Sequence, residues 1–309
     1  MDLKRPQREY RTDLFLDHIH RICIPFRFSL KSISMLCYNK RYGSQQGGIN
    51  MELLFQVIIC FFAGMGAGLG TGFAGMSAAA VITPMLVTFL GMEPYAAVGI
   101  ALASDVLASA ISAYTYGKNK NLDVKNGIVM MVSVLVFTVV GSYISSLVPA
   151  RTMGGFSVCM TFLLGIKFIV RPVMTTKQAM QQVSAQKRLI QSILCGILIG
   201  FICGFVGAGG GMMMLLILTS VLGYELKTAV GTSVFIMTFT AFTGSVSHFA
   251  IGGAPDMLIL FLCVMFTLLW ARIAAVFANK AAPEVLNRAT GIVLVVLGAA
   301  IMVFTYIIK

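Results

Sequence analysis

The stretch Gly204-Phe205-Val206-Gly207-Ala208-Gly209-Gly210-Gly211 decides the fold, because it interrupts an apolar run that is otherwise long enough to cross a membrane. Glycine disfavours a helix by up to about 1 kcal/mol relative to alanine, so this density of glycine predicts that the helix unwinds or turns. Non-helical backbone at membrane depth must be buried in protein or line a water-filled cavity. A helix that restarts there points free N–H groups at the cavity, and such groups can bind an anion.

A related stretch, Gly72-Phe73-Ala74-Gly75-Met76-Ser77, precedes it by 132 residues, the distance from Gly75 to Gly207. The two regions align at this offset without a gap. The other matching pairs are Gly64 and Gly196, Gly68 and Gly200, Leu90-Gly91 and Leu222-Gly223, and Ala97-Val98-Gly99 and Ala229-Val230-Gly231. Self-similarity at a fixed offset over this length predicts an internal duplication.

The composition is that of a membrane protein. Of the 309 residues, 58% are hydrophobic and only 11% are charged, and the mean hydropathy is +0.90. So few charges cannot cover a water-facing surface, which excludes a soluble enzyme, a disordered chain and a nucleic-acid-binding module. The seven cysteines are odd in number and scattered, which argues against a disulfide framework. The net charge of +12 is attributed to basic loops that face the cytoplasm.

We expect an all-α polytopic fold with about eight net crossings and both termini in the cytoplasm. Eight crossings put two Lys/Arg-rich loops, 117–126 and 171–188, in the cytoplasm, as the positive-inside rule favours, whereas ten would put them outside. Each span needs about 20 mostly apolar residues. The apolar stretches are 52–90, 96–116, 127–147, 154–170, 189–222, 228–250, 256–278 and 288–307.

The chain divides into four parts. Residues 1–50 form a polar, basic extension, which is either a cytoplasmic tail or lies upstream of a true start at Met51. Residues 51–170 and 189–309 are two membrane repeats, joined by a polar cytoplasmic linker at 171–188. Four crossings in each repeat would make the two copies run in the same direction, related by an axis along the membrane normal. Such repeats are typical of transporters, whose substrate site lies between the halves.

The glycines divide into two groups. Those spaced four apart, including Gly64, Gly68 and Gly72, favour close packing of helices. The later ones favour an anion site at each break. The predicted substrate-binding residues are Gly75 and Ser77 in the first copy, Gly207, Gly209, Gly210 and Gly211 in the second, and the pair Thr232 and Ser233 in the span that follows.

Two charged residues inside the spans are candidates for coupling or gating. Asp105 lies near the middle of 96–116, where a carboxylate is costly unless it is paired, protonated or wet. It either takes part in proton coupling or makes a helix-to-helix hydrogen bond, and its counterpart in the second copy is Met237. Arg272 lies about six residues from the outer end of its span. It either snorkels to the interface or faces the pathway, where it would pair with Asp105 or an anionic substrate.

The motif Gly72-Phe73-Ala74-Gly75, Leu90-Gly91 and Ala97-Val98-Gly99-Ile100-Ala101, with its second copy 132 residues later, resembles that of the TauE/SafE sulfite exporter family. The resemblance covers residues 51–309, and the second copy is the closer match. It implies a plasma-membrane transporter of two four-helix halves that exports sulfite, sulfonates or related small sulfur-containing anions.

Other functions remain as alternatives. A passive anion channel would use the same glycine breaks but would need no coupling carboxylate. An intramembrane enzyme lacks support, since the sequence contains no H-E-x-x-H, no G-x-S-x-G and no His/Glu cluster with metal spacing. We therefore expect no catalytic residues, metal or cofactor, and no nucleic-acid partner. The expected partners are a small anionic substrate and the lipid bilayer, and a homo-oligomer is compatible with the sequence.

Overall fold

The computed structural model describes residues 48–145, 162–163, 166–173, 184–206, 210–252 and 254–306. Within these ranges the regular structure is entirely helical. The expected N-terminal extension therefore falls almost wholly outside the described residues, as do most of the span 154–170 and the middle of the linker. The helices are α2 (Gly48–Ala74), α3 (Ala79–Leu90), α4 (Pro94–Lys118), α5 (Val124–Ser145), α8 (Ala185–Val206), α9 (Gly210–Ser220), α10 (Leu226–Gly252), α11 (Met257–Lys280) and α12 (Pro283–Tyr306).

The first long apolar stretch is broken, as its glycines predict. Helix α2 ends at Ala74 and α3 begins at Ala79. The chain reverses between them, since a Cβ added to Gly66 of α2 would lie 3.1 Å from Cγ1 of Val81 in α3. The second long stretch also forms two helices, because α8 ends at Val206 and α9 begins at Gly210. The residues between α8 and α9 lie outside the described part of the chain.

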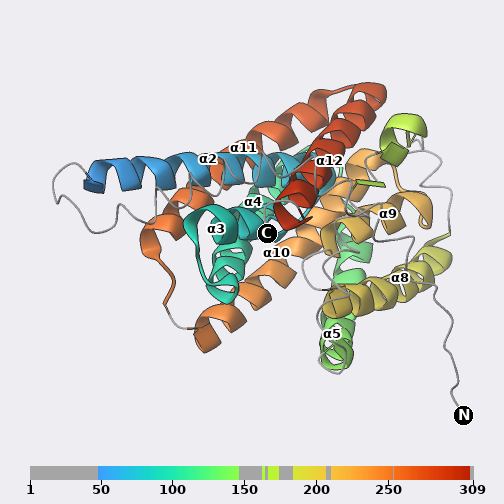
Figure 1. The fold of residues 1–309 in the computed structure, drawn as a ribbon. Coiled ribbons are helices and arrows are strands. Elements are labelled where there is room, and N and C mark those ends of the chain that lie inside the picture. Colours follow the sequence, from blue (N-terminus) through green and yellow to red (C-terminus); the bar gives the residue numbers. More distant parts are fainter. Residues whose placement is uncertain are drawn as a thin grey trace, which may run out of the picture.

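The glycines spaced four apart pack helices together, as the sequence favours. Along α2, a Cβ on Gly68 would lie 2.6 Å from the backbone oxygen of Thr267 in α11, and one on Gly72 would lie 2.5 Å from Cβ of Ala274. In the second half, a Cβ on Gly200 of α8 would lie 2.6 Å from the backbone oxygen of Val134 in α5. Helices α2 and α11 accordingly run side by side, as do α5 and α8 (Figure 1).

Helices α4 and α10 form the central pair and run antiparallel. Near the start of α4, a Cβ on Gly99 would lie 3.2 Å from Cβ of His248, which is close to the end of α10. Near the start of α10, a Cβ on Gly231 would lie 2.8 Å from Cβ of Tyr116, close to the end of α4. Helix α10 follows α4 at the 132-residue offset between the two copies, so the two helices are expected to correspond. Their antiparallel directions differ from the expectation that the two halves run the same way, which rested on loop charges rather than on packing.

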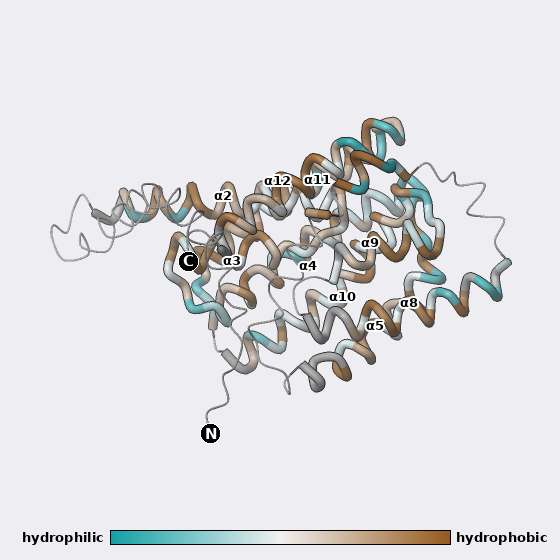
Figure 2. Tube along the Cα trace, turned by 45° about the vertical axis from the view of Figure 1, so that its right-hand side comes forward, coloured by the Kyte–Doolittle hydropathy of each residue, from teal (hydrophilic) through white to brown (hydrophobic). Residues whose placement is uncertain are grey.

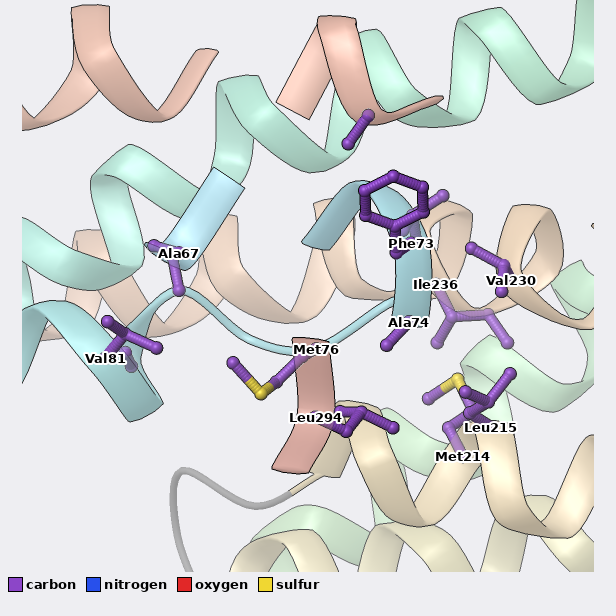
Figure 3. Packing of buried hydrophobic residues seen from close by; sticks show 14 of the residues in the cluster. Ala67, Phe73, Ala74, Met76, Val81, Met214, Leu215, Val230, Ile236 and Leu294 are labelled. Carbon is purple, nitrogen blue, oxygen red and sulfur yellow. The ribbon is translucent and has the colours of Figure 1, made fainter. Parts of the chain in front are cut away.

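The outer surface is suited to lipid. Five described helices, α2, α4, α10, α11 and α12, are long and apolar enough to cross a bilayer. Figure 2 shows hydrophobic colour along most of the helices, with hydrophilic colour gathered toward helix ends. The interior is also apolar around the first break, where the fully buried Met76 belongs to the same hydrophobic cluster as Leu294 of α12 and Met214 and Leu215 of α9 (Figure 3).

We expect Gly68→Ala to destabilise the protein, because its new methyl group would overlap the backbone of α11, which cannot move aside as a flexible side chain can. Overpacking of this kind costs about 1–3 kcal/mol, so the melting temperature of the purified protein in detergent should fall. Gly117→Ala is the matched control, since its methyl group would meet Leu122 at an ordinary 3.4 Å. Equal melting temperatures for the two variants would contradict this account of the α2–α11 contact.

Candidate functional site

The first break, residues 75–78, forms a compact turn rather than a loose loop. Gly75 has φ of +60°, a left-handed conformation that glycine adopts without steric cost. Its amide donates to the backbone oxygen of Thr71 at 3.0 Å, and the amide of Met76 donates to that of Gly70 at 3.2 Å. The Thr71 hydroxyl in turn donates to the backbone oxygen of Met76 at 2.9 Å. These bonds fix the direction in which α3 leaves the turn.

The backbone carbonyls at the end of α2 are satisfied by side chains from three other helices. Tyr116 of α4 donates its hydroxyl to the oxygen of Gly72 at 2.9 Å. Thr290 of α12 donates to Phe73 at 3.2 Å, and Ser233 of α10 donates to Gly75 at 3.2 Å. A helix that ends inside an apolar environment leaves its last carbonyls without partners, and these hydroxyls supply them.

Asp105, on α4, holds a carboxylate at the amino end of α3. The residue is fully buried. It accepts hydrogen bonds from the Ser77 hydroxyl at 2.8 Å and from the Ser109 hydroxyl at 2.9 Å. The break therefore binds a negative group of the protein itself, through uncharged donors.

The second break meets the first at the start of α9. A Cβ on Gly211 would lie 2.4 Å from the backbone oxygen of Gly75 and 2.5 Å from Sδ of Met237. Gly210 is the first residue of α9 and is half-buried. The other two predicted residues of this break, Gly207 and Gly209, lie outside the described part of the chain.

The remaining predicted residues divide between the break and other places. Ser233 lies at the break, but the neighbouring Thr232 accepts a hydrogen bond from the backbone amide of Asp123 at 3.2 Å and so belongs to the contact between α10 and the α4–α5 loop. Arg272 is exposed on α11. The structure does not bring it to Asp105, which is fully buried.

The sequence analysis missed three residues that build the break: Thr71, Tyr116 and Thr290. Thr71 stands inside the glycine-rich run, which is the one signal that could have identified it. Tyr116 and Thr290 bond to backbone carbonyls of a segment distant in the sequence, and nothing in their local pattern marks that role. Within the described ranges, no group of three or more His, Cys, Asp or Glu side chains is placed to hold a metal ion.

Comparison with known proteins agrees with this membrane architecture. The chain matches the family described as sulfite exporter TauE/SafE over residues 60–301. It is 24% identical over 265 residues to the probable membrane transporter protein YunE of Bacillus subtilis, covering 79% of this chain and 97% of that protein. It is 23% identical over 222 residues to the probable membrane transporter protein YdhB of the same organism, covering 72% and 90%.

A third relative comes from an archaeon. The probable membrane transporter protein MJ0441 of Methanocaldococcus jannaschii is 27% identical over 207 residues, covering 65% of this chain and 75% of that protein. No solved structure matches the chain significantly. Because the family match spans most of the sequence and includes both breaks, the chain belongs to the TauE/SafE sulfite exporter family.

Proposed function

We propose that the chain is a plasma-membrane transporter for small anions and that it exports sulfite or organosulfonate-type sulfur compounds. One observation carries the proposal: the carboxylate of Asp105 accepts hydrogen bonds from the Ser77 hydroxyl of the first break at 2.8 Å and from the Ser109 hydroxyl of α4 at 2.9 Å. Sulfite and sulfonates present negatively charged oxygens of the same kind, and uncharged donors at a helix start suit them. The relatives named as probable membrane transporters support the transport class.

We place the substrate where the two halves meet. Three residues lie together there: Gly75 of the first break, Gly211 at the start of α9 and Ser233 of α10. The Ser233 hydroxyl donates to the backbone oxygen of Gly75, and a Cβ on Gly211 would lie 2.4 Å from the same oxygen. Sites of secondary transporters commonly lie between such broken helices near the bilayer midplane. Position 211 has no room for a side chain, because a Cβ there would lie 2.4 Å from the backbone oxygen of Gly75.

The arrangement of helices supports two repeats in inverted orientation. Helix α4 begins at Pro94 and α10 begins at Leu226, 132 residues later, and Gly91 and Gly223 have left-handed φ values of +63° and +65° just before them. At the same offset α2 corresponds to α8 and α5 corresponds to α11. The pairing of α2 with α11 in one place is therefore matched by the pairing of α8 with α5 in the other. Because α4 and α10 are antiparallel, we propose an odd number of crossings in each half in place of four.

Inversion changes the expected orientation. Helices α2 and α4 end close together, since Tyr116 reaches Gly72, so both begin on the same face of the membrane. Helices α5 and α8 also run in one direction, as Gly196 meets Ser133 and Gly200 meets Phe137. The basic α4–α5 loop and the basic start of α8 then share a face, which the positive-inside rule assigns to the cytoplasm. The start of α2 lies on the other face, unlike the expectation of two cytoplasmic termini.

Vesicles that contain the purified protein should transport radiolabelled sulfite or an organosulfonate, and Gly211→Ala should lower that flux by at least about tenfold, a loss that corresponds to 1.4 kcal/mol. The added methyl group would overlap the oxygen of Gly75 at the meeting of the breaks. Gly127→Ala is the control, because its nearest neighbours lie at 3.4 Å. Absence of flux of sulfite, sulfate and organosulfonates in the wild type would refute the proposed function.

We expect Asp105→Asn to separate a coupled carrier from a passive channel. A carrier that uses this carboxylate to respond to a proton gradient should lose its dependence on an imposed pH difference when the side chain can no longer ionise. A channel needs no such group, and its flux would follow the anion gradient equally in both proteins. The measurement is the initial rate of sulfonate flux in vesicles with and without a pH difference.

Labelling of single cysteines should place Lys118 and Ala254 on opposite sides of the membrane. Both residues are exposed, and the antiparallel α4–α10 pair puts the end of α4 and the end of α10 on different faces. In a variant without native cysteines, an impermeant maleimide should label Lys118→Cys only from the cytoplasm and Ala254→Cys only from outside. Labelling of both from the same side would instead support eight crossings in parallel halves.

A further inference from the structure

We propose that Cys60 and Cys263 form a paired thiol site, which a small, uncharged two-electron oxidant converts into a disulfide that links α2 to α11. Both residues are fully buried, and both thiols are free in the structure. The proposal does not depend on which solute the protein transports, because it concerns the contact between two helices and not the breaks.

The first step is the register of the α2–α11 contact. A Cβ on Gly64 would lie 2.6 Å from Cβ of Phe266, and eight residues further along α2 a Cβ on Gly72 would lie 2.5 Å from Cβ of Ala274. The position on α11 has also advanced by eight residues, so the two helices run in the same direction. The close contact therefore keeps one register over two turns of helix.

The second step is that the cysteines occupy the preceding turn of this contact. Cys60 precedes Gly64 by four residues, and Cys263 precedes Thr267 by four. A Cβ on Gly64 would lie 2.9 Å from the backbone nitrogen of Thr267. Residues four apart lie on the same face of a helix, so the register directs the side chain of Cys60 at Cys263. The two thiols interact with each other.

The third step is that the separation of the helices suits a disulfide. The two Cβ atoms of a disulfide lie about 3.5–4.5 Å apart. The Cβ positions of Gly64 and Phe266 are 2.6 Å apart, so the helices are already closer at this turn than a disulfide requires. A small divergence over one turn gives the required separation. The pair can therefore close without drawing α2 and α11 together.

The depth of the pair determines which oxidants can reach it. Cys60 lies nine residues after Met51, where the α2 span begins, and this is about 14 Å along the helix axis. That depth is near the middle of a hydrocarbon core of about 30 Å. Both side chains are also enclosed by protein. A bulky, charged oxidant such as oxidised glutathione is therefore excluded, whereas a small uncharged one can enter when the helices fluctuate.

Diamide is a small uncharged oxidant, and its reaction with the pair balances. One thiol loses its proton and adds through sulfur to the nitrogen–nitrogen double bond of diamide, whose other nitrogen takes up a proton. The second thiol loses its proton and attacks that sulfur. The S–S bond forms as the S–N bond breaks, and the departing nitrogen takes up the second proton. Two thiols are thus oxidised to one disulfide, and diamide is reduced to its hydrazine.

The test is treatment of the full-length wild-type protein in detergent with diamide, followed by blocking of the remaining thiols, digestion without reductant and mass spectrometry. We expect a linked pair of peptides that carry Cys60 and Cys263 and that separate after reduction with dithiothreitol. Oxidised glutathione should not produce this pair.

A second measurement uses a variant in which the other five cysteines are replaced by alanine. Oxidation of this variant by diamide should raise its melting temperature by roughly 5 °C or more, because a cross-link restricts the unfolded chain. Reduction should return the melting temperature to its original value.

The matched control moves one thiol to the neighbouring position of α11. Cys263→Val combined with Val264→Cys in the same variant exchanges two side chains and leaves the composition unchanged. Adjacent residues point about 100° apart around a helix, so the thiol no longer faces Cys60. Linkage by diamide should fall to less than about a tenth of that in the parent variant. The wild-type peptide analysis tests the proposal even if the exchanged variant does not fold.

The proposal is overturned if diamide gives no linked Cys60–Cys263 peptides from the folded wild type, or if the exchanged variant links as readily as its parent. It is also overturned if the link leaves the melting temperature unchanged or lowers it, since the disulfide would then not fit the native contact. Equal linkage by oxidised glutathione would contradict the enclosed position of the pair. Sulfonate flux is not part of these measurements, so their failure would leave the proposed function intact.

Discussion

The fold depends on one constraint, which is that backbone polar groups exposed at a helix break inside a membrane must find partners within the protein. Helix α2 ends where water cannot supply those partners, and the hydroxyls of Tyr116, Thr290 and Ser233 do so from α4, α12 and α10. The break thus joins helices from both halves of the chain. The bonds to the oxygens of Gly72, Phe73 and Gly75 restrain the backbone of the break.

The same constraint explains why glycine is needed in two different ways. At Gly68 and Gly72 the missing side chain lets α11 come close enough for backbone contact, and the helix continues through both positions. At Gly75 the missing side chain permits φ of +60° and the helix ends. The close α2–α11 contact holds the end of α2 in place, so the packing glycines position the turn that the later glycine makes.

The sequence was sufficient to predict the membrane class, the position of the first break and the packing role of the glycines spaced four apart. Each of these follows from local composition, since apolar length and glycine density act within a few residues. The direction of the second half could not be predicted in this way. Loop charges favoured parallel halves, whereas the contacts of Gly99 with His248 and of Gly231 with Tyr116 set α4 and α10 antiparallel. Likewise, the partners of Asp105 depend on how a turn and a helix meet in space.

The difference between the two breaks has a physical consequence. Asp105 in the first half corresponds to Met237 in the second, and the sulfur of Met237 lies 3.9 Å from the Ser233 hydroxyl. A thioether accepts hydrogen bonds weakly and carries no charge, so it does not occupy donors as a carboxylate does. The proposed coupling to a proton gradient rests on this asymmetry, because Asp105 is a carboxylate at the first break and its counterpart Met237 is uncharged.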